Sequence, residues 1–369
     1  MSFAHTKTES KKLPKSTFLN VALSLALGAI GGAIFSFLAL PLPWMLGAMA
    51  TTSIAAALGK PIAMDHRLRL IMIAIIGVLL GSTFNPSMLS QIPQWLTSLA
   101  VLTIFLGVLG VTIPWILRRA GYDAATAYFS ALPAGLTEMT IVGTENGGNG
   151  NIIALTHTVR VLLVAFIIPF TIVVLLGYER PDAAGPPISA LEYLDIILLS
   201  ACALVGLWLG NKFNMPAGAL AAPLALSATI HLAGLTASSP PGALISIAQV
   251  VLGTSVGARF SGITLATTGR TILLSFIITL GMLSLSGFIA FVVGPLIQVD
   301  PMALLLSLSP GGVTEMSLMA LALSQDTAFV TTHHVARIAL IIIVGPTIFV
   351  VMRRIRKTDL RFPTKKNQE

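Results

Sequence analysis

The stretch LPAGLTEM at residues 132–139 recurs in altered form as LSPGGVTEM at residues 308–316, and both copies lie within strongly apolar sequence. Each copy places a proline and a glycine shortly before Thr-Glu-Met. Proline removes a backbone donor and glycine weakens a helix, so we expect the helix to break at each copy. A carboxylate follows each break directly, and in such apolar surroundings it requires a structural or functional reason.

The composition identifies the class of protein. Of the 369 residues, 55% are hydrophobic and only 10% are charged, whereas about a quarter of the residues are charged in typical soluble domains. The mean hydropathy is +0.90, and the chain has many runs approaching the ~20 apolar residues that a helix needs to cross a bilayer. The sequence therefore predicts an all-α polytopic membrane protein whose main partner is the lipid bilayer.

The net charge of +8 does not indicate a nucleic-acid partner. The basic residues lie in the N-terminal tail, in short loops and in RRIRK at 353–357, as is typical of cytoplasmic segments. The only cysteine, Cys202, excludes an intrachain disulfide. Without a cysteine cluster or a group of histidines and carboxylates, we expect no metal and no cofactor.

The apolar run near 18–40 is longer than the hydrophobic part of a signal peptide, so we expect it to remain as the first transmembrane helix. Six apolar segments precede the polar stretch YERPDAAGPP and six follow it. The predicted organisation is a cytoplasmic basic tail at 1–17, a first membrane repeat at 18–177, a linker at 178–189, a second membrane repeat at 190–352 and a cytoplasmic basic tail at 353–369.

The two halves are related by an internal repeat. Aligning the second Pro-x-Gly-x-Thr-Glu-Met motif with the first also aligns, without a gap, the His-x-x-Arg pairs that follow them. Between 131 and 170, nine of forty positions are identical to their counterparts, and most of these are residues other than leucine, isoleucine or valine. A register that differs by one position aligns Gly77 and Gly81 with Gly253 and Gly257, where packing is the expected role. These matches indicate a duplicated membrane unit.

The positions of the positive charges favour an inverted repeat. Basic residues follow the second and fourth segments of the first half, but the equivalent loops of the second half have no Lys or Arg. The converse holds for Lys212, Arg259 and Arg270, whose first-half equivalents are uncharged. Since Lys and Arg mark the cytoplasmic side, the loops have exchanged sides. The alternative, twelve plain spans in two parallel halves, leaves this exchange unexplained.

Inversion requires an odd number of crossings in each half. The motif segment is therefore expected to form a re-entrant hairpin or a broken helix, which gives about 10–12 membrane segments in total. Irregular backbone at membrane depth is tolerated inside protein or beside a water-filled cavity. The two motifs are thus expected to meet near the midplane. The predicted helix-breaking residues are Pro133, Gly135, Pro310, Gly311 and Gly312.

Polar residues near the two breaks are the candidate binding site. Inverted-repeat transporters build midplane sites from half-helix ends and from side chains of this kind. The expected substrate- or ion-binding residues are Thr137, Glu138, His157, Arg160, Thr314, Glu315, His334 and Arg337. No residue is expected to be catalytic or to bind a metal.

Each of these residue types has two open interpretations. The glutamates could carry protons or coordinate a cation while the arginines bind an anionic substrate, or each glutamate could form a structural ion pair with its arginine. Each histidine could act on substrate or proton, or donate to a carbonyl group. Each threonine could donate to a ligand or cap its half-helix.

At these residues the sequence resembles the AbrB family of bacterial membrane proteins, whose members carry the duplicated Pro-x-Gly-x-Thr-Glu-Met segment. The resemblance covers nearly the whole chain and implies a multi-pass protein of the bacterial inner membrane. Members have been described as ammonia monooxygenases or as regulators of gene expression. The six histidines of this chain contain no two-His-one-carboxylate grouping, so the residues do not support an oxygenase.

The sequence therefore predicts a secondary transporter or exporter, not an enzyme. The expected substrate is a small anionic metabolite, coupled to a cation, H⁺ or Na⁺, by alternating access. The alternative is a membrane sensor that affects gene expression indirectly by binding a ligand without moving it. Both termini are expected in the cytoplasm, and the sequence leaves open whether the protein forms a homo-oligomer.

Overall fold

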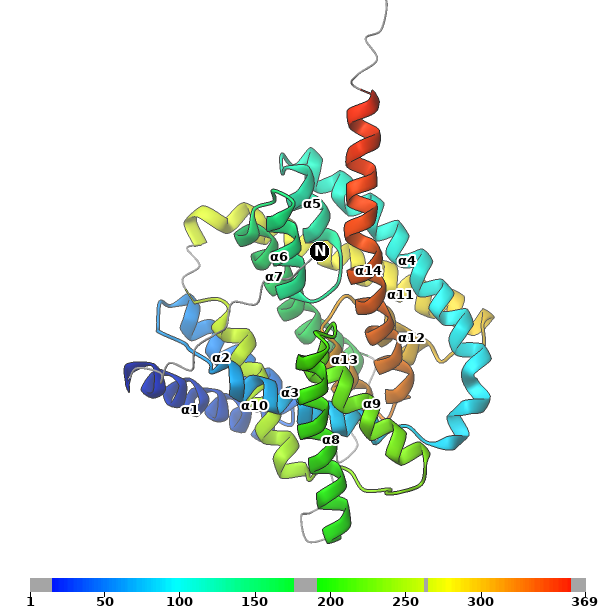
Figure 1. The fold of residues 1–369 in the computed structure, drawn as a ribbon. Helices are drawn as coiled ribbons and strands as arrows, with labels where there is room; N and C mark the ends of the chain where they lie inside the picture. The colour runs from blue at the N-terminus through cyan, green and yellow to red at the C-terminus, as the bar shows by residue number, and fades with distance from the viewer. Residues whose placement is uncertain (1–14, 176–190, 262–264, 360–369) are drawn as a thin grey trace, which may run out of the picture.

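The computed structural model describes residues 15–175, 191–261 and 265–359. The expected linker at 178–189 lies outside the described residues, as do residues 1–14 and 360–369 of the basic tails. The described residues form fourteen α-helices without a β-strand (Figure 1), which confirms the all-α prediction. The first half contains α1 (Lys15–Phe37), α2 (Pro43–Ala57), α3 (His66–Gly81), the 3₁₀-helix η1 (Pro86–Gln91), α4 (Ile92–Arg119), α5 (Ala124–Ala131), α6 (Leu136–Glu145), α7 (Gly150–Phe170) and the π-helix η2 (Thr171–Leu175).

The second half repeats this order of α-helices. It contains α8 (Tyr193–Lys212), α9 (Gly218–Leu232), α10 (Gly242–Ala258), α11 (Leu265–Leu296), α12 (Pro301–Leu308), α13 (Val313–Ala322) and α14 (Thr327–Asp359). The register that aligns the two motifs places α5 on α12 and α6 on α13 with the same first and last residues. It also places the first residue of α7 on the first residue of α14. The duplication seen in the sequence is therefore also a duplication of helices.

Among the described residues, six helices are long and apolar enough to cross a membrane, and they form three counterpart pairs. Their apolar spans are Phe18–Phe37, Ile92–Arg119, Gly150–Val173, Tyr193–Lys212, Thr268–Leu296 and Thr327–Met352. Shorter apolar helices, such as Gly218–Leu232 and Gly242–Ala258, lie between them. This pattern is that of a multi-pass membrane protein.

The two segments that contain the motifs, residues 121–145 and 301–325, are helical hairpins. Residues 132–135 separate α5 from α6, and residues 309–312 separate α12 from α13. The N–H of Asn149, just after α6, donates to Thr126 Oγ1 over 2.7 Å, so the end of α6 lies beside the start of α5. In the second half Asp300 and Asp326, at the two ends of the α12–α13 segment, line one small cavity. Both motifs therefore lie at the turn of a hairpin.

Glycines bring helices of opposite halves into close contact. A Cβ atom at Gly77 would lie 2.7 Å from the carbonyl oxygen of Leu220 on α9, and one at Gly81 would lie 2.5 Å from that of Leu224. On α10, a Cβ at Gly253 would overlap the carbonyl oxygen of Met45 on α2. The expected packing role of these glycines is confirmed, since small residues allow helix backbones to approach closely.

The helices form two groups, each built from both halves. In the glycine group, α1, α2, α3, α8, α9 and α10 pack on one another, and in the hairpin group α4–α7 pack with α11–α14. The two groups touch mainly where α3 meets α13 and α14 and where α2 meets α7. Figure 1 shows the glycine group in blue and green, to one side of α4, α11 and α14.

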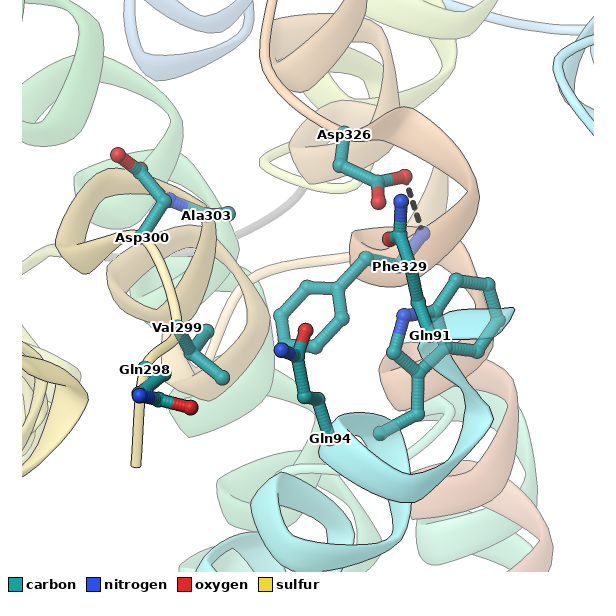
Figure 2. Close-up of a pocket in the computed structure, with 9 residues that line it drawn as sticks. Gln91, Gln94, Gln298, Val299, Asp300, Ala303, Asp326 and Phe329 are labelled. Carbon is teal, nitrogen blue, oxygen red and sulfur yellow. Dashed lines mark hydrogen bonds between the residues drawn. The ribbon is translucent and has the colours of Figure 1, made fainter. Parts of the chain in front are cut away.

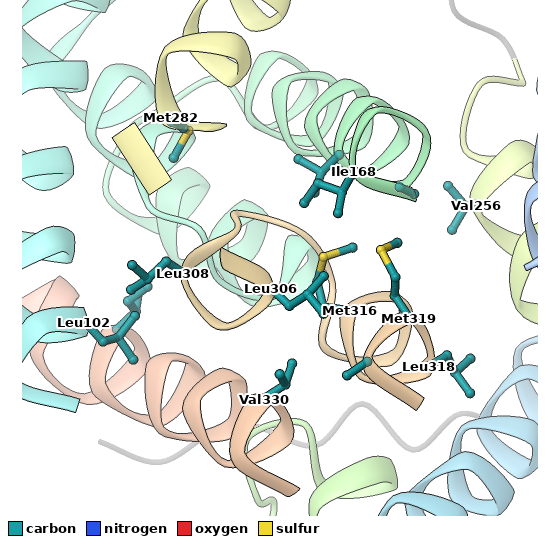
Figure 3. Close-up of a cluster of buried hydrophobic side chains, with 14 of the residues drawn as sticks. Leu102, Ile168, Val256, Met282, Leu306, Leu308, Met316, Leu318, Met319 and Val330 are labelled. Atoms are coloured by element: carbon teal, nitrogen blue, oxygen red, sulfur yellow. The ribbon is translucent and has the colours of Figure 1, made fainter. Parts of the chain in front are cut away.

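Buried aliphatic and methionine side chains fix the second hairpin within its group. Leu306 and Leu308 of α12 and Met316 of α13 have no exposed surface. Around them lie Leu102 of α4 and Ile168 of α7, which are also buried (Figure 3). The second hairpin is therefore surrounded by protein rather than by lipid, as irregular backbone at membrane depth requires.

The counterpart helices α4 and α11 run antiparallel. Arg270, near the start of α11, donates through Nη2 to the carbonyl oxygen of Ala120, just after α4, over 2.8 Å. At the other end, Gln94 near the start of α4 and Gln298 just after α11 line the same small cavity. Each of these helices therefore ends where its counterpart begins.

Candidate functional site

A cavity of about 680 Å³ lies between the glycine group and the hairpin group. Both hairpin turns line it, with residues 134–138 from the first and residues 310–315 from the second. The opposite wall comes from the start of α3, the end of α10 and the α8–α9 turn. The two motifs thus meet at one cavity, although they lie in opposite halves of the sequence.

The structure brings most of the predicted site residues to this cavity. The residues that line it are Thr137, Glu138, His157, Arg160, Thr314, Glu315 and Arg337. His334 is fully buried and does not line the cavity. Of the predicted helix-breaking residues, Gly135, Pro310, Gly311 and Gly312 contribute to the wall, and Pro133 is buried behind it.

Arg160 and His157, on α7, bind the carbonyl end of α5. Arg160 donates through Nη1 to Ser130 O over 3.2 Å and through Nη2 to Leu132 O over 3.1 Å. His157 donates through Nε2 to Phe129 O over 2.9 Å, and its Nδ1 accepts from Arg160 Nη2 over 2.7 Å. The last carbonyl groups of a helix have no partner within the helix. The His-x-x-Arg pair therefore caps the end of α5.

The second His-x-x-Arg pair does the same for α12. Arg337 donates through Nη1 to Ser309 O and through Nη2 to Gly311 O, each over 2.6 Å. His334 donates through Nε2 to Leu306 O over 2.9 Å. Both histidines thus donate to a carbonyl group, as one of their two interpretations predicted. A positive charge at a helix C-terminus also interacts favourably with the helix dipole.

A structural ion pair between each glutamate and its arginine, one of the two predicted alternatives, is wrong. Within the described residues, the guanidinium groups of Arg160 and Arg337 bind backbone carbonyl groups and His157. The carboxylates of Glu138 and Glu315 fold back over Gly135 and Gly312 instead. The physical reason is that each arginine is already engaged by the open end of the preceding half-helix.

Each glutamate lies in the first turn of its half-helix, beside the cavity. Glu138 is in the first turn of α6 and Glu315 is in the first turn of α13. Glu315 is only 6% exposed, whereas Glu138 is half-buried. A carboxylate in the first turn stabilises a helix through its dipole. Both acids are therefore held in place at the cavity wall.

Capping of the half-helices by the threonines, one of their two predicted alternatives, is not observed. The N-cap residues are Gly135 and Gly312, which have no side chain to do so. Thr314 donates instead from Oγ1 to Glu315 Oε2 over 2.8 Å. Thr137 is exposed on the cavity side. The Thr314 hydroxyl thus binds its neighbouring glutamate, and Thr137 lies at the cavity next to Glu138.

Two arginines that the sequence interpretation used only as markers of membrane orientation also line the cavity. Arg69 lies in the first turn of α3, and Arg259 directly follows α10. The hydroxyl of Ser261 donates to Ile62 O over 3.0 Å, which places the end of α10 beside the start of α3. No repeat motif marks these arginines, so only the helix packing reveals them.

The cavity combines charges of both signs. Arg69 and Arg259 repel each other electrostatically, and both are attracted by Glu138 and Glu315. The N-termini of α6 and α13 add partial positive charge at the hairpin turns. Such an arrangement can bind an anion at the arginines and helix ends, and a proton or cation at the carboxylates.

A second, smaller cavity of about 140 Å³ lies at the open end of the second hairpin (Figure 2). Its polar wall includes Asp300 and Asp326, but both carboxylates cap helices. Asp300 accepts from the N–H groups of Met302 and Ala303, and Asp326 accepts from that of Phe329 over 2.9 Å. These hydrogen bonds give both acids a structural role.

The histidines and acids of the described residues do not form a metal site. In the parts of the chain that the structure describes, no three His, Cys, Asp or Glu side chains gather as metal ligands would. The buried His333 donates through Nδ1 to Phe329 O over 2.8 Å, and its Nε2 forms a hydrogen bond with Ser98 Oγ over 2.8 Å. These contacts tie the start of α14 to α4.

The family profile described as "Transition state regulatory protein AbrB" matches residues 44–353. A Bacillus subtilis (strain 168) protein named "Uncharacterized protein YhjN" is 26% identical over 353 residues, which cover 88% of this chain and 91% of that protein. An Escherichia coli (strain K12) protein named "Putative regulator AbrB" is 24% identical over 322 residues, covering 85% of this chain and 91% of that protein. Since the profile matches well over half of the residues, the chain belongs to the AbrB family of membrane proteins.

Proposed function

We propose that this protein is a secondary transporter or exporter of a small anionic metabolite, coupled to H⁺ or Na⁺. The observation that carries the proposal is the cavity between two helix groups, into which both hairpin turns bring a glutamate. A site at such a boundary changes its access when one group moves against the other. Transport rather than chemical conversion is the corresponding activity, in the bacterial inner membrane with both termini in the cytoplasm.

Helix directions support an inverted repeat as the basis of this movement. In this proposal the hairpins enter the membrane without crossing it, and α1, α2, α3, α4 and α7 would then give an odd number of crossings in the first half. The antiparallel course of α4 and α11 agrees with inversion. So does a pair of basic and aromatic contacts, Arg119 on Trp115 at 4.3 Å and Lys212 on Trp208 at 4.4 Å. Inversion places both contacts at the cytoplasmic interface, where such residues concentrate.

The cavity is lined asymmetrically, as one state of an alternating-access cycle requires. The α8–α9 turn contributes residues 210, 211 and 214–220 to the wall. Its counterpart, the α1–α2 turn at residues 38–42, contributes none. In an inverted repeat, the second state arises when the halves exchange conformations. The α1–α2 turn would then take the place of the α8–α9 turn.

Coupling follows from the charges around the two glutamates. Loading Glu138 or Glu315 with a proton or cation removes negative charge that competes with an anion for the arginines. Two unit charges ~8 Å apart interact by about 2 kcal/mol at an effective dielectric constant of ~20. By linkage, a bound anion raises the affinity of the glutamate for its proton or cation by the same factor. The other charged or titratable groups of the cavity are His66, Arg69, His157, Arg160, Arg259 and Arg337.

A sensor is the second candidate, favoured by the name of the Escherichia coli relative, "Putative regulator AbrB". A sensor would bind a ligand in the same cavity without moving it across the membrane. Its effect on gene expression would then be indirect, through a partner of the ligand-bound state. Flux measurements separate the two candidates, whereas binding measurements alone do not.

The test uses purified protein in proteoliposomes that contain a pH-sensitive dye. Succinate, hexanoate and phosphate are added outside, with either a proton or a sodium gradient. We expect gradient-dependent anion flux that falls at least tenfold in Glu138→Gln and in Glu315→Gln. The matched control is Glu145→Gln, because Glu145 lies on the same helix as Glu138 but is exposed outside the cavity.

Binding measured on the same variants completes the test. Glutamine resembles a protonated glutamate, so anion binding should persist in the variants and lose its pH dependence. Binding without flux in the unaltered protein would overturn the transporter proposal and favour the sensor. Flux that is unchanged in both glutamine variants would remove the glutamates from the coupling mechanism.

A further inference from the structure

Arg69 and Arg259 differ from the other two cavity arginines in their partners. Arg160 and Arg337 donate to the carbonyl ends of α5 and α12. Arg69 and Arg259 line the same cavity, and within the described residues neither guanidinium group has a hydrogen bond or an ion pair. Both side chains are partly exposed to the cavity. They are therefore the arginines that a ligand can reach.

The position of this pair is also not explained by the repeat. In the register that aligns the glycines of α3 with those of α10, Ile245 is the counterpart of Arg69. The counterpart of Arg259 in that register is Thr83. The two arginines thus come from unrelated positions of the two halves, and they meet because the end of α10 lies beside the start of α3. Their mutual repulsion is an energetic cost that an anion between them would remove.

The two arginines of the facing wall have donors that the protein does not fully satisfy. Arg160 and Arg337 are 3% and 2% exposed, and the Nε atom of each has no hydrogen-bond partner among the described residues. Both arginines line the cavity beside the N-termini of the half-helices α6 and α13. Buried donors without partners are rare in folded proteins. The hairpin side of the cavity thus contains positive groups beside Glu138 and Glu315, and both kinds of charge face Arg69 and Arg259.

We propose that Arg69 and Arg259 form the anion-binding pair of the cavity and bind the carboxylate group of a small organic acid with an aliphatic body. The proposal rests on the proposed function, since it names the substrate class of the same cavity. The planar guanidinium group matches a carboxylate through two parallel hydrogen bonds. The arginines would hold the charged end of the ligand, and the half-helix N-termini would face it.

The walls of the cavity decide between an organic acid and an inorganic anion. Besides its charged residues, two threonines and two asparagines, the cavity is lined by aliphatic side chains, among them Leu70, Ile73, Ile141, Val161, Ile338 and Ile342. A sulfate or phosphate ion would leave these surfaces in contact with water. An aliphatic chain would bury them, at about 25 cal/mol for each Å² of apolar surface removed from water. The cavity therefore fits a carboxylate that carries hydrocarbon.

The test measures binding to the purified, full-length protein by isothermal calorimetry. The probes are succinate, glutarate and hexanoate, with inorganic phosphate and sulfate for comparison. We expect the carboxylates to bind and their affinity to fall at least tenfold in Arg69→Gln and in Arg259→Gln. Arg69→Lys should restore only part of the affinity, because lysine keeps the charge but not the paired hydrogen bonds. The matched control is Arg67→Gln, since Arg67 lies close to Arg69 on the same helix but is exposed outside the cavity.

Each outcome distinguishes this inference from the transporter proposal. Unchanged melting temperature in the absence of ligand shows that the variants are folded, and the lysine variant serves if a glutamine variant is not. Carboxylate affinity that is the same in both glutamine variants overturns the inference, even if the protein transports the probe. Equal or tighter binding of phosphate and sulfate, or no carboxylate binding at all, also overturns it. Arginine-dependent binding without flux supports the inference and counts against transport.

Discussion

Arg337 on α14 donates through Nη2 to the carbonyl oxygen of Gly311 over 2.6 Å, within the break between α12 and α13. This contact joins the second motif to the helix that follows it. The open end of a half-helix at membrane depth has no water to satisfy its carbonyl groups. A fixed guanidinium group therefore allows the hairpin to turn inside the protein, and the motif and its downstream arginine form one structural unit.

Removing this guanidinium group should destabilise the protein strongly. We expect Arg337→Ala to lower the free energy of unfolding by about 3 kcal/mol or more, because buried carbonyl groups lose a charged donor. Arg337→Lys should recover part of the loss. The control is Arg270→Ala, since Arg270 also donates to a carbonyl oxygen, that of Ala120, but is exposed. Thermal unfolding in detergent measures the stability of all three variants. Equal losses of stability in Arg337→Ala and Arg270→Ala would contradict the capping role of Arg337.

A side chain at the glycine contact between α2 and α10 should also destabilise the protein. A Cβ atom at Gly253 would overlap the carbonyl oxygen of Met45, and backbone cannot move aside easily. We expect Gly253→Ala to cost about 1–3 kcal/mol, as overpacking of a core usually does. In Gly269→Ala the new Cβ would meet no atom within 4 Å. That control should be neutral or slightly stabilising, because alanine favours a helix, and a loss as large as that of Gly253→Ala would argue against close packing.

Membrane orientation can be read from engineered cysteines. In a Cys202→Ala background, cysteines at Lys60 and Lys212 should both react with a membrane-impermeant reagent from the cytoplasm. A cysteine at Ser87, which is exposed in η1, should react only from the other side. An inverted repeat requires this pattern, because Lys60 and Lys212 then lie on the same side. Labelling of the Lys212 position from outside alone would show that the halves are not inverted.

Asp326 allows a prediction of pH dependence. Burial raises the pKa of its carboxyl group above the ordinary value, and the hydrogen bonds from the N–H groups of Phe329 and Ala328 only partly oppose this. A folded-state pKa above the unfolded value means that stability is lost as pH rises through the folded pKa. Asp326→Asn should therefore raise the melting temperature slightly at neutral pH. The difference should shrink as pH falls toward the ordinary pKa of an aspartate.

The first half already contains the corresponding amide. Asn149 aligns with Asp326 and caps α7 through Oδ1, which accepts from the N–H groups of Asn151 and Ile152. Asparagine can thus replace the cap without loss of hydrogen bonds. A stabilisation by Asp326→Asn that is equally large at low and neutral pH would show that burial of the charge is not its cause.

The hairpins could be predicted because their signals are local. Proline and glycine weaken a helix wherever they occur, and the exact spacing of the second copy identified both breaks and their shared surroundings. The packing of Gly77 and Gly253 was predictable for the same reason, since a glycine inside an apolar helix needs a close neighbour. These inferences need only the chain itself and its repeat.

The roles of the arginines could not be predicted because they depend on distances between helices. The sequence alone is equally compatible with an ion pair between Glu138 and Arg160 and with a hydrogen bond from Arg160 to a carbonyl group. Only the position of α7 beside the end of α5 decides between them. Likewise, Arg69 and Arg259 look like ordinary charges at the ends of membrane helices until α3 and α10 are placed side by side.

The exchange of helix contacts between halves affects how the chain can be assembled. The α3 face that contains Gly77 and Gly81 is covered by α9, and α2 is covered by α10. When the ribosome has made only the first half, neither surface has its partner. The first half can insert into the membrane at that stage but cannot complete its packing. Final folding must therefore wait for residues 218–258, and we expect a fragment that ends in the linker to be degraded unless the second half is supplied separately.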